Sequence, residues 1–177
     1  MGEYRLNLLI SREQIASIVK DLADQISKDY REKELVLVCI LKGAFMFLSD
    51  LVRHLQISVK IDFVRLASYG AGMKSSGRIE ITKDIETSIE GKDVLIVEDI
   101  VDSGRTLQFL RDRLSLANPN SVKICALLDK KARREVEIEV DADGVVGLQG
   151  VQVVFVCPNL GVPHLRRLQT QQQLIIG

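Results

Sequence analysis

The fold of this chain follows from one stretch of its sequence, Val94-Leu-Ile-Val-Glu-Asp-Ile-Val-Asp-Ser-Gly-Arg-Thr106. An apolar run of this kind predicts a strand that is covered on both faces, here from Asp93 to Val101. Apolar residues then recur at helical spacing from Leu107 to Ala117, and Asn118-Pro119-Asn120 ends the predicted helix. A strand followed by a tight turn and a helix is the repeating step of an α/β fold.

The same step is found earlier in the chain, where the apolar run Leu35–Leu41 is followed by Lys42-Gly43 and a helix from Phe47. Before it, Ser11 and Gln14 have the spacing of a capping box and begin a helix to about Tyr30. Alternating strands and helices predict a mostly parallel twisted sheet flanked by helices, which binds ligands at the carboxyl ends of its strands. The other predicted elements are a strand from Leu35 to Leu41, a helix from Phe47 to Leu55, strands at about Lys60 to Ala67 and Ser121 to Asp129, and an alternating strand from Glu135 to Asp141.

Length and composition limit the possible classes of protein. With 177 residues, 46% of them hydrophobic, the chain suffices for one core and is short for two, so we expect a single domain over residues 1–177. Lys plus Arg and Asp plus Glu both number 24, which argues against nucleic acid or an anionic membrane as the main partner. No apolar run reaches the roughly 18 residues of a membrane span, and residues 1–10 lack the pattern of a signal peptide. These features predict a cytoplasmic protein.

The cysteines are odd in number, far apart and set in apolar stretches, without metal-ligand spacing. We therefore interpret Cys39, Cys125 and Cys157 as reduced core residues rather than as zinc ligands or redox groups.

Polar residues gather where the central strand ends. Glu98 and Asp99 are adjacent carboxylates, which are costly to desolvate unless they meet a cation or hydroxyl donors, and Mg²⁺ with ribose hydroxyls supplies both. Ser103, Gly104 and Thr106 then open a helix, whose free N–H groups and dipole attract a phosphate. The segment has the character of a sugar-phosphate cradle. The alternative for any one of these residues is an acidic turn with an ordinary helix cap.

In this stretch the sequence resembles the type I phosphoribosyltransferases, whose signature is an apolar strand, two acids, two apolar residues, Asp, Ser or Thr, Gly, any residue and Thr. The resemblance covers about Leu6 to Asp141, close to four fifths of the chain. It extends to segments similar to pieces of the hypoxanthine-guanine phosphoribosyltransferases, namely Leu41–Phe45, Asp62–Phe63, Ser68–Tyr69 and Leu127–Lys130.

The resemblance implies a Mg²⁺-dependent enzyme that transfers the phosphoribosyl group of phosphoribosyl pyrophosphate to a purine nitrogen and releases pyrophosphate. Glu98 and Asp99 would hold the ribose hydroxyls and organise Mg²⁺, and Asp102 would sit beside purine N7 as the general acid/base. For Asp102 taken alone, helix capping is the simpler interpretation. Ser103, Gly104, Arg105 and Thr106 would hold the 5-phosphate, and Glu98, Asp99 and Asp102 belong with them to the implied site for the phosphoribosyl group.

Two lysines also carry implied roles. Lys42-Gly43 would bind pyrophosphate through backbone N–H groups, and in the family this bond can be cis. Lys130 would donate to the 6-oxo group of hypoxanthine or guanine, which excludes adenine because its 6-amino group offers no acceptor. Taken alone, Lys42 has the character of a surface lysine and Lys130 that of a solvated basic face with Lys131, Arg133 and Arg134.

The segment 68–84 is expected to be a mobile active-site loop. Three glycines and three serines fall between Ser68 and Gly77, which precludes a regular element there. By resemblance, Ser68, Tyr69 and the glycine-rich segment would close over the site and keep water away from the reacting sugar. An ordinary flexible hairpin loop is the alternative.

The C-terminal part, residues 142–177, departs from the family pattern and does not align with it. We expect it to form a small hood with the N-terminal segment. Phe155 is the candidate to stack on the base, although core packing is its alternative. A divergent base site, a sequence or frame error and an enzyme of reduced activity all remain open. Other candidates in this part are Asp143 and Asn159 for polar contacts and His164, Arg166 and Arg167 for pyrophosphate.

Three functions remain open at this point. The first is salvage of 6-oxopurines, with hypoxanthine and guanine as substrates. The second is a regulator that senses phosphoribosyl pyrophosphate, which the neutral charge and the lack of a helix-turn-helix disfavour. The third is an enzyme for xanthine or a pyrimidine, which the altered tail permits. The resemblance implies a homo-oligomer, because small enzymes of this type commonly assemble as dimers or tetramers, although no residue specifies the number of subunits.

Overall fold

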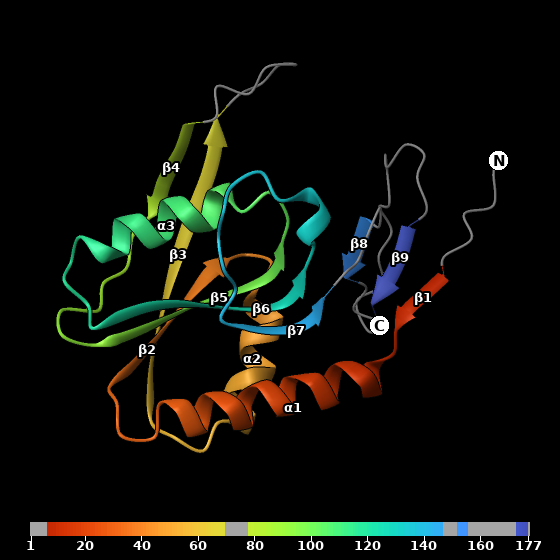
Figure 1. Ribbon diagram of the computed structural model, residues 1–177, viewed down its shortest axis with the longest axis horizontal. Coiled ribbons are helices and arrows are strands. Elements are labelled where there is room, and N and C mark those ends of the chain that lie inside the picture. Colours follow the sequence, from red (N-terminus) through yellow and green to blue (C-terminus); the bar gives the residue numbers. More distant parts are fainter. Residues whose placement is uncertain (1–6, 70–77, 147–151, 156–172, 177) are drawn as a thin grey trace.

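The computed structural model describes residues 7–69, 78–146, 152–155 and 173–176. Its elements follow the predicted order closely, and both α1 and the three buried strands of the predicted sheet core occupy their expected positions (Figure 1). The elements in chain order are β1 (Asn7–Ile10), α1 (Arg12–Asp29), β2 (Leu35–Leu41), α2 (Phe45–His54), β3 (Val59–Tyr69), β4 (Arg78–Lys83), β5 (Asp93–Val101), α3 (Arg105–Ser115), β6 (Ser121–Asp129), the 3₁₀ turn η1 (Lys131–Arg133), β7 (Ala142–Val146), β8 (Gln152–Phe155) and β9 (Gln173–Ile176).

The main sheet has six strands in the order β4-β3-β2-β5-β6-β7. All neighbouring pairs are parallel except β3 and β4, which form an antiparallel pair at one edge. The predicted mostly parallel sheet is therefore confirmed. Its parallel strands all direct their carboxyl ends to the same edge, where ligands of such sheets bind.

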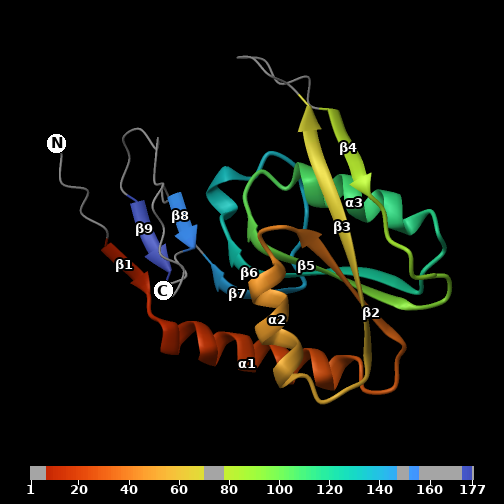
Figure 2. The same cartoon turned by 180° about the vertical axis from the view of Figure 1, so that it is seen from behind.

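Helices cover both faces of this sheet. Figures 1 and 2 show α1 and α2 on one face and α3 on the other. The continuous apolar sequence of β2 explains the arrangement, because successive side chains point to opposite faces. Leu35, Leu37 and Cys39 pack into the core under α1 and α2, whereas Val36 and Val38 pack into the core under α3. Cys39 and Cys125 are both buried thiols, as predicted, and Cys157 lies outside the described residues.

The capping box at the start of α1 is confirmed. Ser11 Oγ accepts a hydrogen bond from Gln14 N at 3.2 Å, and Ser11 N donates to Gln14 Oε1 at 2.8 Å. These two bonds satisfy N–H groups that the first turn of a helix otherwise leaves without partners.

A second, smaller sheet joins the two ends of the chain. Strand β9 lies between β1 and β8, and both pairs are parallel. The predicted hood of N- and C-terminal segments therefore has a backbone counterpart beside the main sheet (Figure 1). Its predicted start at residue 142 was wrong, because Ala142–Val146 form β7 of the main sheet. In the described part of the chain, no helix is both long and apolar enough to cross a membrane.

Two predicted segments differ from the structure. The alternating segment 135–141 is not a strand, and the neighbour of β6 in the sheet is β7 instead. Apolar and polar residues do alternate in this segment, but the apolar ones pack on the core without forming a strand. Val136, Ile138 and Val140 cover the core under α3. The predicted loop 68–84 was too long: β3 continues to Tyr69 and β4 starts at Arg78. The alternation of polar and apolar residues in β4 was the missed signal.

Candidate active site

Three of the predicted site segments lie toward the carboxyl edge of the main sheet. Strands β2, β5 and β6 are parallel neighbours, and Val101 at the end of β5 is in register with Asp129 at the end of β6. Lys42 directly follows β2, the acidic pair lies near the end of β5, two residues before Val101, and Lys130 directly follows β6. Segments that are far apart in the sequence are thus brought to one place by the topology of the sheet.

Gly43 lies against the carboxylate of Asp99. A Cβ atom added at Gly43 would be 2.6 Å from Asp99 Oδ2, a distance at which one of the two groups has to move. The backbone after β2 and the acid at the end of β5 are therefore in direct contact, and glycine is the residue that permits it. The cis peptide bond here joins Leu41 and Lys42, so its expected position, between Lys42 and Gly43, was wrong by one residue. Sequence offers no signal for this position because neither bond precedes a proline.

Glu98 is the most strongly perturbed acid of the site. Its pKa is raised well above its ordinary value, first by burial and then by hydrogen bonding and charge repulsion from Asp99. Asp99 N donates to Glu98 Oε1 at 3.1 Å, which opposes this shift. The same two acids also contribute to the raised pKa of the Cys39 thiol, about 12, although burial is its main cause. Two carboxylates that repel one another in a partly buried position are suited to a cation or to hydroxyl donors.

The acidic pair fits a magnesium ion better than a transition metal. Carboxylate oxygens are hard ligands, and Mg²⁺ is commonly held by one or two carboxylates together with substrate phosphates and water. Among the described residues there is no group of three or more His, Cys, Asp or Glu side chains placed to hold a metal. Two carboxylates such as Glu98 and Asp99 could supply part of a magnesium ligand set, with the remaining ligands coming from substrate and water.

The turn from β5 into α3 has the geometry of an anion cradle. Gly104 is buried and has φ of +82°, and a Cβ atom there would lie 2.8 Å from Ile138 and 3.0 Å from Val136. Gly104 at the N-cap position offers no side chain to cap α3, and Arg105 N makes a long hydrogen bond of 3.5 Å to Ser103 Oγ. The N–H groups of this first turn are suited to a bound anion, which the helix dipole also favours.

Asp102 lies beside this cradle and next to two basic side chains. Its Oδ1 atom is 3.3 Å from Nε of Arg133, and its charge also acts on Lys130. The geometry of the Arg133 contact is that of an ion pair only, because buried Oδ1 accepts no hydrogen bond from any described residue. Asp102 therefore does not cap α3, and the capping interpretation is wrong.

Lys130 is buried, with 5% of its surface exposed. Burial lowers its pKa, the charge of Asp102 raises it and that of Arg133 lowers it further. The interpretation of Lys130 as part of a solvated basic face is therefore wrong, whereas Lys131 and Arg133 are exposed as that interpretation expects. A buried ammonium group at the edge of the site is a donor without water around it, which is suited to recognising a carbonyl oxygen.

Sequence reasoning missed the contacts that hold the segment after β6. Arg134 forms an ion pair with Asp129, whose side chain is 1% exposed. Arg105 Nε lies 2.7 Å from Glu135 Oε2, which joins the first residue of α3 to the same segment. The run of basic residues at 130–134 suggested a solvated face, because their acidic partners are not apparent from the sequence.

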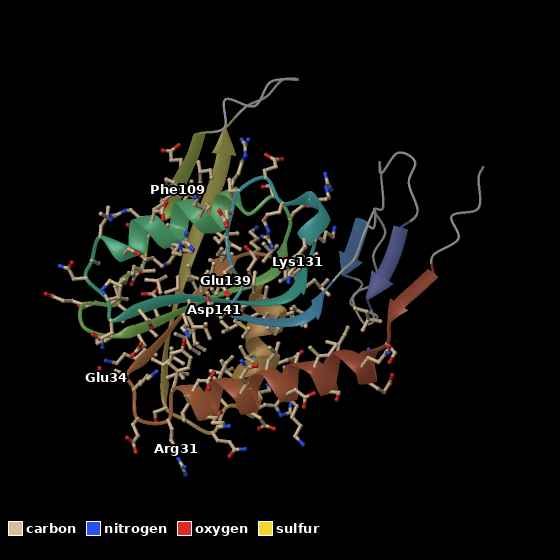
Figure 3. All side chains as sticks on the ribbon, viewed as in Figure 1. Arg31, Glu34, Phe109, Lys131, Glu139 and Asp141 are labelled. Atoms are coloured by element: carbon tan, nitrogen blue, oxygen red, sulfur yellow. The ribbon has the colours of Figure 1, made fainter. Side chains whose placement is uncertain are left out.

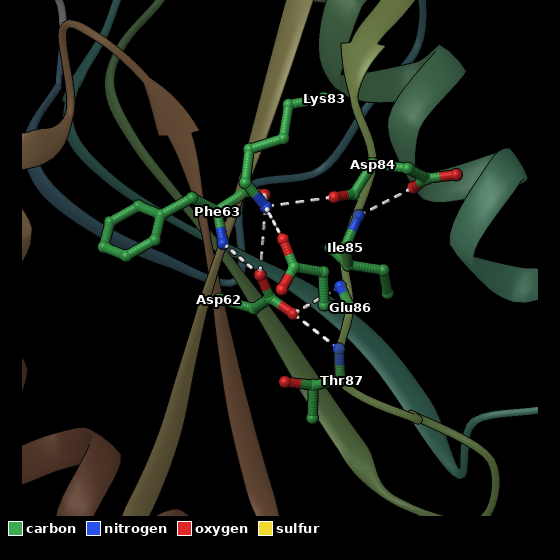
Figure 4. Close-up of polar contacts among 7 residues, drawn as sticks. All are labelled: Asp62, Phe63, Lys83, Asp84, Ile85, Glu86 and Thr87. Carbon is green, nitrogen blue, oxygen red and sulfur yellow. Dashed lines mark hydrogen bonds and ion pairs between the residues drawn. The ribbon is translucent and has the colours of Figure 1, made fainter.

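Asp62, one of the residues that carried the resemblance, has a structural role (Figure 4). Its Oδ2 atom accepts hydrogen bonds from Glu86 N at 2.7 Å and Thr87 N at 2.6 Å, and Oδ1 accepts one from Phe63 N at 2.7 Å. Although burial alone would raise its pKa, these hydrogen bonds lower it below the ordinary value. Asp62 thus ties the segment after β4 to the middle of β3.

Several predicted site residues cannot be placed as side chains. Ser68 and Tyr69 belong to the backbone of β3, Asp143 to β7 and Phe155 to β8, but their side chains lie outside the described structure, as do residues 70–77. A pocket of about 410 Å³ lies between the segment 84–90 and the C-terminal end of α3, and it contains none of the predicted site residues. The other predicted residues outside the described range are Asn159, His164, Arg166 and Arg167.

The chain is similar to known proteins over most of its length. Residues 10–158 match the family model described as a phosphoribosyl transferase domain. A hypoxanthine-guanine phosphoribosyltransferase of Streptococcus thermophilus is 46% identical over 134 residues, which are 76% of this chain and 74% of that protein. The hypoxanthine phosphoribosyltransferase of Escherichia coli is 44% identical over 144 residues, 80% of this chain and 81% of that protein.

Solved structures give the same result. The crystal structure of a hypoxanthine phosphoribosyltransferase from Staphylococcus aureus matches with a TM-score of 0.76 and 44% identity, covering 79% of this chain and 76% of that one. The hypoxanthine phosphoribosyltransferase from Trypanosoma cruzi, in complex with the product IMP, matches with a TM-score of 0.74 and 36% identity, covering 82% of each chain.

Proposed function

Because this chain belongs to the phosphoribosyltransferase family, we propose that it transfers the phosphoribosyl group of phosphoribosyl pyrophosphate to hypoxanthine. The products are IMP and pyrophosphate, and guanine gives GMP in the same way. The chain is a hypoxanthine phosphoribosyltransferase of purine salvage, as relatives at about 45% identity over about 80% of its length bear out. Its location in the cytoplasm stays a prediction.

The observation that carries this proposal is the meeting of three chemically different groups at one edge of the sheet. The acidic pair Glu98 and Asp99 can hold hydroxyls and a cation, and the uncapped start of α3 can hold a phosphate. The buried ammonium of Lys130 can read a carbonyl oxygen. A ribose phosphate donor and a 6-oxopurine together present all the groups that this set of residues can bind.

The residues of the site divide the reaction between them. The 5-phosphate sits on the backbone of residues 103–106, and the peptide N–H groups of Lys42-Gly43 hold the pyrophosphate beside Asp99. As the bond from the sugar to the purine nitrogen forms, the bond to pyrophosphate breaks and its electron pair leaves with the pyrophosphate. The proton on purine N7 moves to the carboxylate of Asp102, which balances the charge on the base.

Mg²⁺ is the proposed cofactor, held by Glu98 and Asp99 together with the substrate. When bound, it supplies positive charge to the pyrophosphate as that group leaves. The perturbed pKa of Glu98 supports this assignment, because burial beside a second carboxylate disfavours the ionised acid until a cation is present.

Discrimination between bases rests on Lys130. Its buried ammonium donates to the 6-oxo group of hypoxanthine, guanine or xanthine and finds no acceptor on the 6-amino group of adenine. A buried donor left without a partner costs free energy, so adenine is rejected strongly. Phe155 is the proposed stacking partner of the base, and Ser68 and Tyr69 with the following segment are the proposed cover of the site.

The proposal is tested by pyrophosphate release from phosphoribosyl pyrophosphate and Mg²⁺ with hypoxanthine, guanine, xanthine and adenine in parallel. We expect turnover with the first two, none with adenine, and a loss in kcat of roughly 100-fold or more in Asp102→Asn. Binding of the sugar donor without turnover of any base would contradict the proposal and favour a sensing protein. Turnover with xanthine or a pyrimidine alone would reassign the substrate.

A further inference from the structure

We propose that Arg133 is a positioning residue for Asp102: it holds one carboxylate oxygen so that the other faces the purine. This inference rests on the proposed function, because it concerns the group to which that function assigns the proton transfer. Arg133 stands outside every segment to which a role in catalysis or binding has been assigned above. Its position next to Asp102 appears only in the tertiary structure.

The two oxygens of Asp102 differ in their surroundings. Oδ1 is covered by protein and lies 3.3 Å from Nε of Arg133, without a hydrogen bond from any described residue. The side chain as a whole is nevertheless 46% exposed. Because Oδ1 contributes almost nothing to this exposure, the open side of the carboxylate is the side that carries Oδ2. A carboxylate held in this way offers one oxygen to an incoming proton donor.

Arg133 is itself held by the backbone on both sides. Arg133 N donates to the carbonyl oxygen of Lys130 at 3.0 Å, which closes the 3₁₀ turn η1. Glu135 N donates to the carbonyl oxygen of Ser103 at 3.0 Å, and Lys130 N donates to that of Val101 at 3.0 Å. The turn that carries Arg133 is therefore attached to the phosphate cradle before and after it. Its guanidinium group lies 3.3 Å from Asp102 and is 63% exposed.

The charge of Arg133 suits this role for a second reason. A carboxylate accepts a proton from the base only if it is ionised and correctly turned when the base arrives. A guanidinium group is planar and always charged, so its attraction for one carboxylate oxygen favours one orientation of its partner. Lys130 also acts on Asp102, but it is required for the 6-oxo group of the purine. Arg133 leaves Lys130 available for the base.

Arg133→Gln tests the proposal, with Lys131→Gln as the matched control. Lys131, labelled in Figure 3, is exposed on the same turn and undergoes the same change of charge. We expect Arg133→Gln to lower kcat with hypoxanthine by roughly three- to tenfold, the size expected of a partly exposed pair acting on a proton transfer. The KM for phosphoribosyl pyrophosphate should change less than about twofold, because the proposed loss lies in the proton transfer from the base and not in binding of the sugar donor. Lys131→Gln should resemble the wild type, and Arg133→Lys should recover part of the loss.

A double-mutant cycle with Asp102→Asn separates positioning from a general loss of structure. If Arg133 acts through Asp102, Arg133→Gln has no further effect on kcat once Asp102 is changed. Equal losses in the Asp102→Asn and wild-type backgrounds would overturn the proposal, as would equal losses in Arg133→Gln and Lys131→Gln. Failure of the proposed function is seen separately, as absence of turnover by the unaltered chain with every purine.

Discussion

Gly104 is the residue on which the phosphate cradle depends most directly. Its backbone lies in the left-handed region, with φ of +82°, and its missing side chain leaves room for Ile138 and Val136. Any other residue there meets two costs, the conformation itself and the close contact with these apolar side chains. The conformation of the turn and the packing of the core under α3 therefore both require glycine at position 104.

Gly104→Ala should lower the free energy of unfolding by about 2–4 kcal/mol, the sum of a left-handed conformation and overpacking. Gly91→Ala is the matched control, because Gly91 has φ of +66° but nothing within 4 Å of its added Cβ. In the control Gly91→Ala, the free energy of unfolding should fall by only about 1–2 kcal/mol. Urea unfolding followed by circular dichroism measures both values, and equal losses would show that the contact with Ile138 is relieved at no cost.

The segment that follows β6 shows what a buried ion pair does for an element. Asp129 ends the strand and pairs with Arg134, and both side chains are largely excluded from solvent, at 1% and 15% exposure. The pair fixes the turn that carries Lys130 and Arg133. Such a pair adds little net stability compared with an apolar one, but breaking it leaves an uncompensated buried charge.

Arg134→Met should therefore destabilise the protein by about 3 kcal/mol or more. Arg53→Met is the control at the surface, since the pair of Arg53 with Asp50 is 74% and 54% exposed and should be worth less than about 1 kcal/mol. Thermal and urea unfolding of the two variants give the comparison. A small decrease in the free energy of unfolding of Arg134→Met would mean that the turn after β6 is held by its backbone hydrogen bonds alone.

The stability of the connection between β4 and β5 depends on pH, because a carboxylate, that of Asp62, accepts the hydrogen bonds that hold it. Hydrogen bonds from the backbone of Glu86 and Thr87 help to lower the pKa of Asp62 in the folded protein. The unfolded chain therefore binds the proton more readily than the folded one, so Asp62 stabilises the fold above its ordinary pKa of 3.8 and this contribution is lost as the pH falls.

Asp62→Asn should destabilise the protein by about 2 kcal/mol at pH 7, the range of hydrogen bonds to a charged group. At pH 3 the difference from the wild type should be smaller, because the wild-type carboxylate is itself becoming protonated. Glu86→Gln, with an 83% exposed side chain, is the control and should show little effect at either pH. A constant difference at both pH values would contradict the role of charge.

At the scale of the whole molecule, the two sheets have to act together. The acidic pair and the cradle belong to the main sheet, whereas the proposed stacking residue Phe155 belongs to β8 in the small sheet. Strand β9 joins β8 to β1, which leads directly into α1 on the main sheet. Both ends of the chain are thus tied to the body that carries the site.

If residues 1–177 form one domain, the chain should unfold in a single cooperative transition. Loss of turnover and loss of helical circular dichroism should then share one midpoint in urea. Activity that disappears at a lower urea concentration would indicate that the small sheet unfolds separately. The expected dimer or tetramer is measured independently by light scattering of the same preparation, and a monomer would contradict it.

The sequence by itself determined the strands of the sheet core, the capping box of α1 and the family signature from Glu98 to Thr106, because these depend on local periodicity and on neighbouring residues. Tertiary structure decided how the elements meet. In the folded protein Lys130 is buried, although its neighbours in the sequence are charged. Arg133 lies beside Asp102, and Gly43 lies against Asp99. Tertiary structure also left residues 135–141 outside the sheet, since β7 pairs with β6 instead. Such contacts join segments whose local sequence carries no record of the partner, so they follow only from the packed fold.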